Sequence, residues 1–188
     1  MGTISSFYKT LAKKIHEDNV AMGWWDDPDE CIFQKLQLVS TEIAEATEGA
    51  RKNLMDTHLK NRKMEEVEYA DAMIRILDIG GKLDLVYYDI DPHNYCLPTN
   101  SVGYQQLGIN AAIVRMAKSL REYLHNPEVE VLKTVLNHDY STVIKSIARV
   151  AGNRSCEIFD ATEEKLIYNA QRSDHKRENR EQANGKKF

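Results

Sequence analysis

Two pairs of acidic residues, each with helical spacing, constrain the fold of this 188-residue chain more than any other feature. Glu42 and Glu45 form the first pair, and Glu68 and Asp71 form the second. Residues i and i+3 share a helix face, so each pair presents its carboxylates from neighbouring turns. If the two helices pack antiparallel, four carboxylates converge, which is tolerable only with bound cations or wide exposure to water. Donors that are all oxygen favour Mg²⁺, Mn²⁺ or Ca²⁺ over zinc.

The segment around the second pair has the pattern of a buried helix. When residues 64–83 are plotted at about 100° per residue, the apolar side chains spread over most of the circumference. The polar side chains fall within one arc of under about 100°, and they are Glu68, Asp71, Arg75 and Asp78. An unpaired buried charge costs several kcal/mol, so ionised groups on such a helix indicate a functional site.

The segment around the first pair has an apolar stripe at the spacing of a core-facing helix. Its members are Ile32, Leu36, Val39, Ile43, Ala46, Ala50 and Leu54. Glu42 and Glu45 flank this stripe, and Glu48 extends the same acidic edge by one turn and is a candidate substrate contact. Lys35 and Lys52 lie near that edge and are candidate phosphate contacts. An ordinary surface pair between Glu48 and Lys52, at i and i+4, explains these two residues equally well.

These segments resemble a known family. Residues 35–52 and 65–78 carry a gapped Glu-x-x-Glu and Glu-x-x-Asp motif that looks like MazG-type proteins of the all-α nucleoside triphosphate pyrophosphohydrolase superfamily. Residues 165–172 and 185–188 resemble the C-terminal part of phage and bacterial MazG-like proteins. The likeness covers roughly residues 1–83 and 156–188 and leaves the middle of the chain unexplained.

The resemblance implies a four-helix bundle that hydrolyses a nucleoside triphosphate between the α and β phosphates, giving a monophosphate and pyrophosphate. It implies Mg²⁺ as cofactor, with Mn²⁺ as a possible substitute, held by Glu42, Glu45, Glu68 and Asp71. Either Glu42 or Glu45 would orient the attacking water. It also implies a homodimer or homotetramer. The chain has no P-loop, so Walker-type chemistry is not indicated.

The C-terminal segment suggests further substrate contacts. Residues 173–188 form a basic tail that we expect to be mobile in isolation. Asn169, Arg172 and Lys186 match family-like positions and are candidate phosphate contacts, as is Arg75 in the polar arc. The chain departs from the family pattern where Arg172-Ser173 replaces an expected Arg-Pro. Trp25 is a candidate for stacking on a base, although an indole at a helix end more often covers a core.

The rest of the chain predicts an all-α single domain spanning residues 1–188. Expected helices cover about 4–21, 29–55, 59–83, 104–125, 128–151 and 156–178, with the third loosening or ending at Gly80-Gly81. Residues 85–103 read as a connector. Residues 104–151 have helical periodicity without recognisable chemistry, and we interpret them as a helical insertion packed on the four-helix unit.

Composition excludes several functional classes. The net charge of −4, with no basic face in the main body, argues against a nucleic-acid-binding protein. No apolar run approaches the roughly 20 residues that span a bilayer, so no membrane partner is expected. The three cysteines lack Cys-x-x-Cys spacing, which favours a cytoplasmic protein with reduced thiols, in the host cytoplasm if the gene belongs to a phage.

Two other functional classes remain open at this level. A ferritin-like di-iron bundle also uses carboxylates on facing helices, but it requires Glu-x-x-His on two of them, which neither pair has. A non-catalytic helical interaction protein could instead use the carboxylates as an acidic docking surface. Within the hydrolase interpretation, the base and sugar preference are open, and canonical nucleotides, modified nucleotides and alarmones are all candidates.

Overall fold

The computed structural model describes residues 2–27, 32–90 and 101–180, and every regular element in those ranges is helical. This confirms the all-α prediction. The elements are α1 (Gly2–Ala21), α2 (Ile32–Lys52), α3 (Met64–Lys82), α4 (Val102–His125), α5 (Glu130–Asn153), α6 (Ile158–Gln171), the 3-10 helix η1 (Ser173–His175) and α7 (Arg177–Arg180). An isolated antiparallel bridge joins Met55 to Lys63 in the α2–α3 connection.

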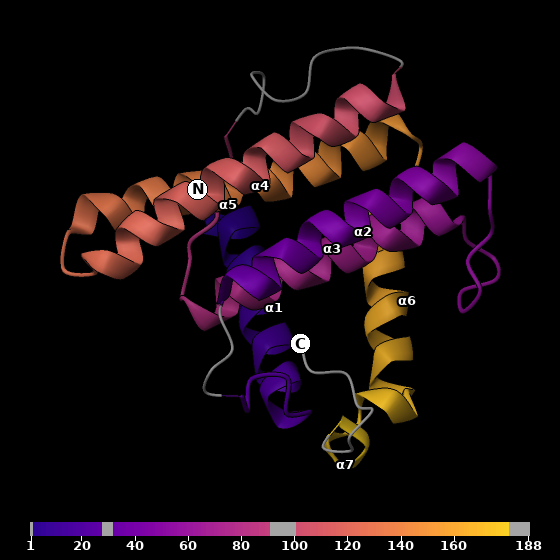
Figure 1. The fold of residues 1–188 in the computed structure, drawn as a ribbon, viewed down its shortest axis with the longest axis horizontal. Coiled ribbons are helices and arrows are strands. Elements are labelled where there is room, and N and C mark those ends of the chain that lie inside the picture. Colours follow the sequence, from indigo (N-terminus) through magenta and orange to yellow (C-terminus); the bar gives the residue numbers. More distant parts are fainter. Residues whose placement is uncertain (1, 28–31, 91–100, 181–188) are drawn as a thin grey trace.

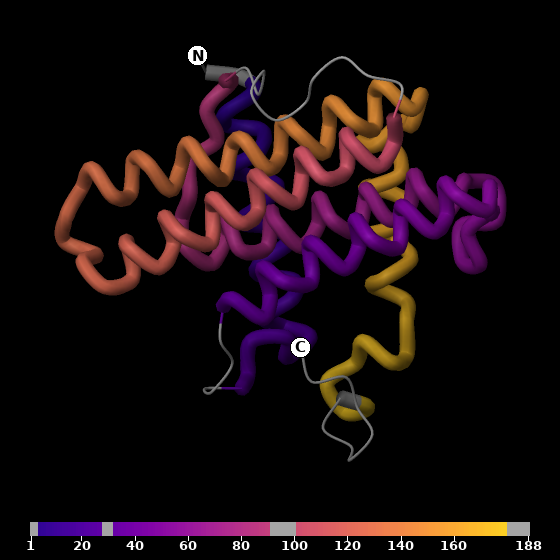
Figure 2. Tube along the Cα trace, turned by 45° about the horizontal axis from the view of Figure 1, so that its top comes forward, coloured from indigo at the N-terminus to yellow at the C-terminus, as the bar shows by residue number. Residues whose placement is uncertain are grey.

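Helix α3 lies at the centre of the fold. It packs against α1, α2, α5 and α6, and most of its side chains are buried, as the pattern around the second acidic pair predicts. Helices α2 and α3 run antiparallel, and α1 and α6 both cross α3, at separate positions along its length (Figures 1 and 2). Because α3 is central, the acidic residues along it are buried or partly buried, whereas Lys82 at its end is exposed.

Glycines inside α3 allow its close packing. Gly80 and Gly81 were candidates for ending this helix, yet α3 continues through both to Lys82. A Cβ atom on Gly80 would collide with the hydroxyl of Tyr140, and one on Gly81 would collide with the backbone of Ala12. The two glycines therefore let α5 and α1 approach α3, and that packing outweighs their low helix propensity.

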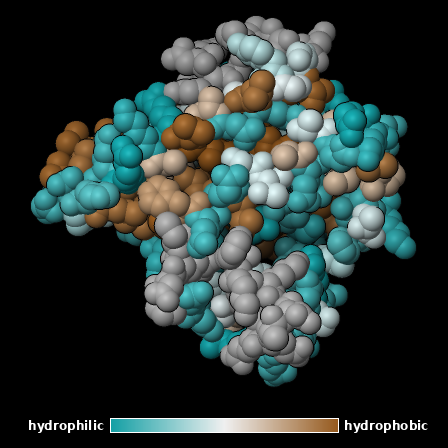
Figure 3. All heavy atoms as spheres, viewed as in Figure 1, coloured by the Kyte–Doolittle hydropathy of each residue, from teal (hydrophilic) through white to brown (hydrophobic). Residues whose placement is uncertain are grey.

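Helices α4 and α5 form an antiparallel hairpin that packs on α2 and α3. This hairpin corresponds to the helical insertion predicted at 104–151. Apolar side chains gather over it on the visible face of Figure 3, and Tyr104, Leu107 and Val114 of α4 are among the exposed ones. Assembly as a dimer or tetramer stays a prediction.

The last expected helix, 156–178, is interrupted in the structure. Helix α6 ends at Gln171 because Arg172 has an extended backbone, with φ −69° and ψ 128°. The chain then forms η1 and α7, and Arg177 Nη2 donates to the carbonyl of Val20, 3.1 Å away, at the end of α1. Within the described ranges, no helix is long and apolar enough to cross a membrane.

Candidate metal centre

Three carboxylates from two helices converge beside the core. Glu42 comes from α2, and Glu68 and Asp71 come from α3; one oxygen from each lies within 4.8 Å of the others. Glu42 and Glu68 are only 6% and 7% exposed. The i, i+3 spacing on α3 and the antiparallel packing of α2 produce this convergence, as the two acidic pairs predict.

Two cations neutralise part of this cluster. Arg75, one turn along α3 from Asp71, donates from Nε to Glu42 Oε1. Lys165, from α6, places its Nζ 2.8 Å from Asp71 Oδ2 and is itself buried. No ion pair to Glu68 occurs within the described parts of the chain. Three carboxylates therefore share two cations.

The cluster has fewer cations than carboxylates, and the pKa values of Glu68 and Asp71 are raised. Burial, followed by the charges of Asp71 and Glu42, raises the pKa of Glu68 to about 9. Burial also raises the pKa of Asp71, although Lys165 opposes that shift. Burial alone would lower the pKa of Lys165, but the nearby carboxylates, Asp71 first and then Asp56 and Glu68, together outweigh burial and raise this pKa. Without a further cation, Glu68 therefore holds a proton at neutral pH.

The donor set fits a hard divalent cation. All three candidate ligands are carboxylates, and Mg²⁺ or Mn²⁺ takes oxygen ligands at about 2.0–2.2 Å. Opposite ligands of one such ion lie roughly 4.2 Å apart, so the 4.8 Å limit of the cluster requires only a small closure. A cation there would replace the proton on Glu68 and compete with Arg75 and Lys165 for the other two carboxylates.

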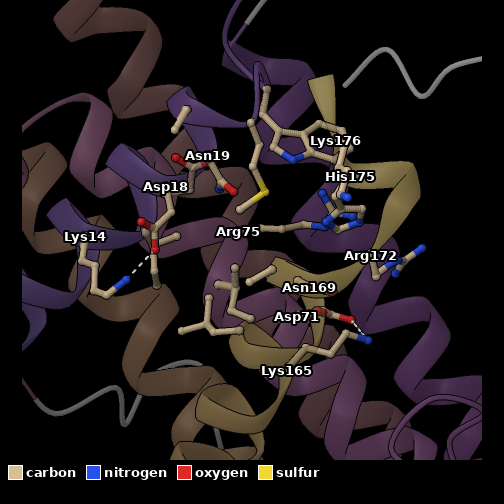
Figure 4. Close-up of a pocket in the computed structure, with 18 of the residues that line it drawn as sticks. Lys14, Asp18, Asn19, Asp71, Arg75, Lys165, Asn169, Arg172, His175 and Lys176 are labelled. Carbon is tan, nitrogen blue, oxygen red and sulfur yellow. Dashed lines mark hydrogen bonds and ion pairs between the residues drawn. The ribbon is translucent and has the colours of Figure 1, made fainter. Parts of the chain in front are cut away.

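A cavity of about 740 Å³ opens beside this cluster, between α1 and α6, with α3 at its base. Its lining includes six basic residues against three aspartates. The basic residues are Lys14, Lys35, Arg75, Lys165, Arg172 and Lys176. Figure 4 shows Asp71 and its ion pair with Lys165 on the α6 side, and Asp18 and Asn19 on the α1 side. The cavity thus combines an acidic cluster with a surplus of positive charge, which suits a polyphosphate brought in with a metal ion.

Other candidates from the acidic edge of α2 lie outside the cluster. Glu45 is exposed and is not one of the three converging residues, although its charge contributes to the raised pKa of Glu68. Glu48 pairs with Lys52 and with Arg51, whose Nη2 lies 2.6 Å from Glu48 Oε2. This is the ordinary surface pairing that the sequence also allowed. None of these residues lines the cavity.

Lys35 and the two tryptophans that follow α1 lie close together, and they differ in whether they line the cavity. Lys35 lines the cavity, and its Nζ donates to the carbonyl of Trp24, 2.7 Å away, and lies 4.9 Å from the ring centroid of Trp25. Trp25 is not among the lining residues, whereas Trp24 is. The indole available to a ligand is therefore Trp24, which meets His175 edge to face at 5.2 Å.

The three C-terminal candidates differ in where they lie. Asn169 and Arg172 both line the cavity. Arg172 also binds Asp174, with Nη2 2.6 Å from Oδ2, so it is already oriented by its own segment. Lys186 lies outside the described residues.

Sequence reasoning missed two features of this site. Lys165 belongs to the segment 165–172 that resembles the family, but the sequence gives it no role. Its buried position on α6 next to Asp71 depends on long-range packing. Asp78 was placed in the polar arc of α3 without a role. In the structure it accepts hydrogen bonds from Asn19 and Trp25 and bonds to His16 Nδ1 at 2.8 Å. The i, i+3 spacing of His16 and Asn19 on the first helix was the available signal.

Comparison of the chain with protein-family models, with curated proteins and with solved structures gives no match. Functional inference therefore rests on the residues and geometry described above.

Proposed function

We propose that this protein is a Mg²⁺-dependent nucleoside triphosphate pyrophosphohydrolase, cleaving between the α and β phosphates. The observation that carries the proposal is the position of the acidic cluster at the edge of the cation-lined cavity. Asp71 belongs to both, and Arg75 and Lys165 line the cavity while neutralising cluster carboxylates. The MazG-like motifs named above support the same reaction.

The cluster residues would hold the metal, and the cavity cations would bind the phosphates. Mg²⁺ bound there supplies neutralisation of the phosphate charge and a lowered pKa for a bound water. Arg75 and Lys165 can exchange their carboxylate partners for phosphate oxygens once the cluster gains a cation. Arg172 is already oriented at the cavity wall by Asp174. As the MazG-like motif implies, we assign the role of orienting water and accepting its proton to Glu42 or Glu45.

The reaction is tested by incubating the purified protein with Mg²⁺ and a panel of ribo- and deoxynucleoside triphosphates and resolving the products. We expect monophosphate and pyrophosphate, with activity lost in Glu42→Gln. Asp139→Asn is a matched control, because Asp139 is a buried, ion-paired carboxylate on α5 that does not line the cavity. Diphosphate and orthophosphate as products, or equal activity of Glu42→Gln and wild type, would refute the proposal.

The competing interpretation, an acidic docking surface without catalysis, fits the geometry less well. A docking surface needs accessible carboxylates, whereas Glu42 and Glu68 are almost completely buried. Asp71 is engaged by Lys165. We place the activity in the cytoplasm, where nucleoside triphosphates are available, without nucleic-acid or membrane partners.

A further inference from the structure

We propose that Asn19 makes the cavity selective for nucleotides whose base carries an exocyclic amino group. This inference rests on the proposed function and names the substrate class of the same site. The residues that carry it surround Asp78, which lies two helical turns from Asp71, at the end of the cavity away from the cluster.

Asp78 is a buried acceptor held from three directions. His16 Nδ1 lies 2.8 Å from Oδ1, and Trp25 Nε1, which can only donate, lies 3.1 Å from Oδ1 and 3.2 Å from Oδ2. Asn19 Nδ2 donates to Oδ2 at 2.8 Å. Both carboxylate oxygens therefore accept, and the side chain is fixed in the core, where it is 6% exposed.

This arrangement fixes the orientation of the Asn19 amide. An ionised carboxylate offers no donor, so the NH₂ group of Asn19 must face Asp78 and the carbonyl oxygen must face away. Within the described part of the chain, Asn19 Oδ1 receives no hydrogen bond. Because Asn19 lines the cavity, this oxygen is available as an acceptor for a ligand.

Helix α3 sets the distance between this acceptor and the phosphate-binding end. Asp71 and Asp78 both line the cavity, and the step of seven residues from one to the other corresponds to two turns, about 10 Å along the axis. This separation is comparable to the length of a nucleoside. A nucleotide whose α-phosphate lies near Asp71 can therefore place the edge of its base near Asn19.

Asn19 Oδ1, a hydrogen-bond acceptor, discriminates between bases by whether they present a donor to it. Cytosine, adenine and guanine carry an exocyclic amino group that can donate to Asn19 Oδ1. At the corresponding ring position uracil, thymine and hypoxanthine present a carbonyl oxygen, and only the neighbouring ring N–H is left to donate. A site built to bind an exocyclic amine discriminates against bases with a carbonyl oxygen at that position, because two acceptors then face each other and its own polar group is left unpaired.

The test measures binding separately from turnover. The affinities of the uncleavable α,β-methylene analogues of dCTP and dUTP are measured by titration calorimetry with Mg²⁺ present, together with kcat/KM for dCTP and dUTP. We expect the dCTP analogue to bind at least about tenfold more tightly and kcat/KM to differ in the same direction. Equal wild-type affinities for the two analogues would overturn the inference without need of any variant.

Variants assign the discrimination to Asn19. Asn19→Ala should reduce the ratio of the two affinities to within about twofold, since the acceptor is gone. Asn169→Ala, a second asparagine of the same cavity near the phosphate end, should weaken both analogues equally and keep the ratio. A ratio preserved in Asn19→Ala would also overturn the inference.

The inference and the proposed function fail in different ways. Hydrolysis of both triphosphates without discrimination contradicts the role of Asn19 and leaves the reaction intact. Discriminating binding without hydrolysis contradicts the reaction and leaves the role of Asn19 intact. No binding of either analogue contradicts both.

Discussion

Two buried acidic sites in this molecule solve the same electrostatic problem differently. In the α4–α5 hairpin, Asp139 has a side chain only 2% exposed and pairs with Arg115, whose Nε lies 2.8 Å from Oδ1, while His138 Nδ1 lies 3.6 Å from the same oxygen. On α2 and α3, three carboxylates share two cations, Arg75 and Lys165. The first site has at least one cation for its single carboxylate, whereas the second has only two cations for three carboxylates.

The difference separates a structural ion pair from a binding site. A paired buried carboxylate needs no ligand, and removing its partner mainly destabilises the fold. A cluster with more carboxylates than cations must either hold a proton or bind a further cation. The raised pKa of Glu68 corresponds to the first case, in which Glu68 is protonated. The cluster, unlike Asp139, also borders a cavity that a ligand can enter.

The largest effect that we expect is on catalysis. Glu68→Gln should lower kcat/KM for triphosphate hydrolysis by about 10³-fold, or roughly 4 kcal/mol, because it removes a metal ligand while keeping the shape. Asp139→Asn should leave kcat/KM of the folded protein within about twofold. The comparison between the two sites breaks down if the two variants lose similar activity at saturating Mg²⁺.

The second prediction concerns the cation that the metal would displace. Lys165→Met leaves Asp71 buried beside two other carboxylates, so we expect the metal-free protein to lose about 3 kcal/mol in urea unfolding. Because a bound cation can take the place of the ammonium group, Mg²⁺ should stabilise this variant more than it stabilises wild type. Lys52→Met, at an exposed surface pair, is the matched control and should show neither effect. Equal Mg²⁺ responses of Lys165→Met and wild type would mean that Lys165 and the metal do not compete.

The third prediction uses the pH dependence of stability. Glu68 ionises near its ordinary pKa of 4.5 in the unfolded chain but near 9 in the folded protein, so between these values the folded state holds more protons. The free energy of unfolding contributed by Glu68 therefore falls as pH rises through this window. Because glutamine does not ionise, Glu68→Gln should stabilise the metal-free protein at pH 8 by about 1–3 kcal/mol.

The gain in Glu68→Gln should disappear as the pH approaches 4.5, where Glu68 is increasingly protonated in both states. This gain in the free energy of unfolding is measured by urea unfolding of wild type and variant across pH 5–8, with EDTA present. A variant less stable than wild type throughout would show that the Glu68 carboxylate is favourably solvated or paired.

The smallest effect is expected at the acidic edge of α2. Glu48 pairs with Arg51 and Lys52 at the surface, so Glu48→Gln should leave the urea midpoint unresolved from wild type and kcat/KM within about twofold. A KM raised tenfold or more would instead place Glu48 at the substrate, as the sequence allowed.

The fold was largely predictable because it depends on local periodicity. The apolar stripes place most helix ends within about five residues, except that the expected helix 156–178 ends at Gln171. The polar arc of α3 includes both Glu68 and Asp71, which meet in the cluster, and Asp78, which lies two turns away. Gly80 and Gly81 were misread, since low helix propensity is a local signal and their contacts with Tyr140 and Ala12 are not.

The site was only partly predictable because one of its two cations, Lys165, comes from elsewhere in the chain. Residues 42 and 45 lie about 60° apart around α2, and the sequence does not say that Glu42 faces α3 while Glu45 faces solvent. Lys165 reaches Asp71 only through the packing of α6 on α3. The shortage of positive charge in the cluster is therefore a property of the tertiary structure.

The most direct test of the metal centre is the anomalous difference density of a crystal grown with Mn²⁺ and an uncleavable α,β-methylene nucleotide. We predict a peak among Glu42, Glu68 and Asp71, about 2.2 Å from an oxygen of each, with Arg75 and Lys165 moved toward the phosphates. The ion pairs of Glu42 with Arg75 and of Asp71 with Lys165 left intact, with no peak between the carboxylates, would contradict the account.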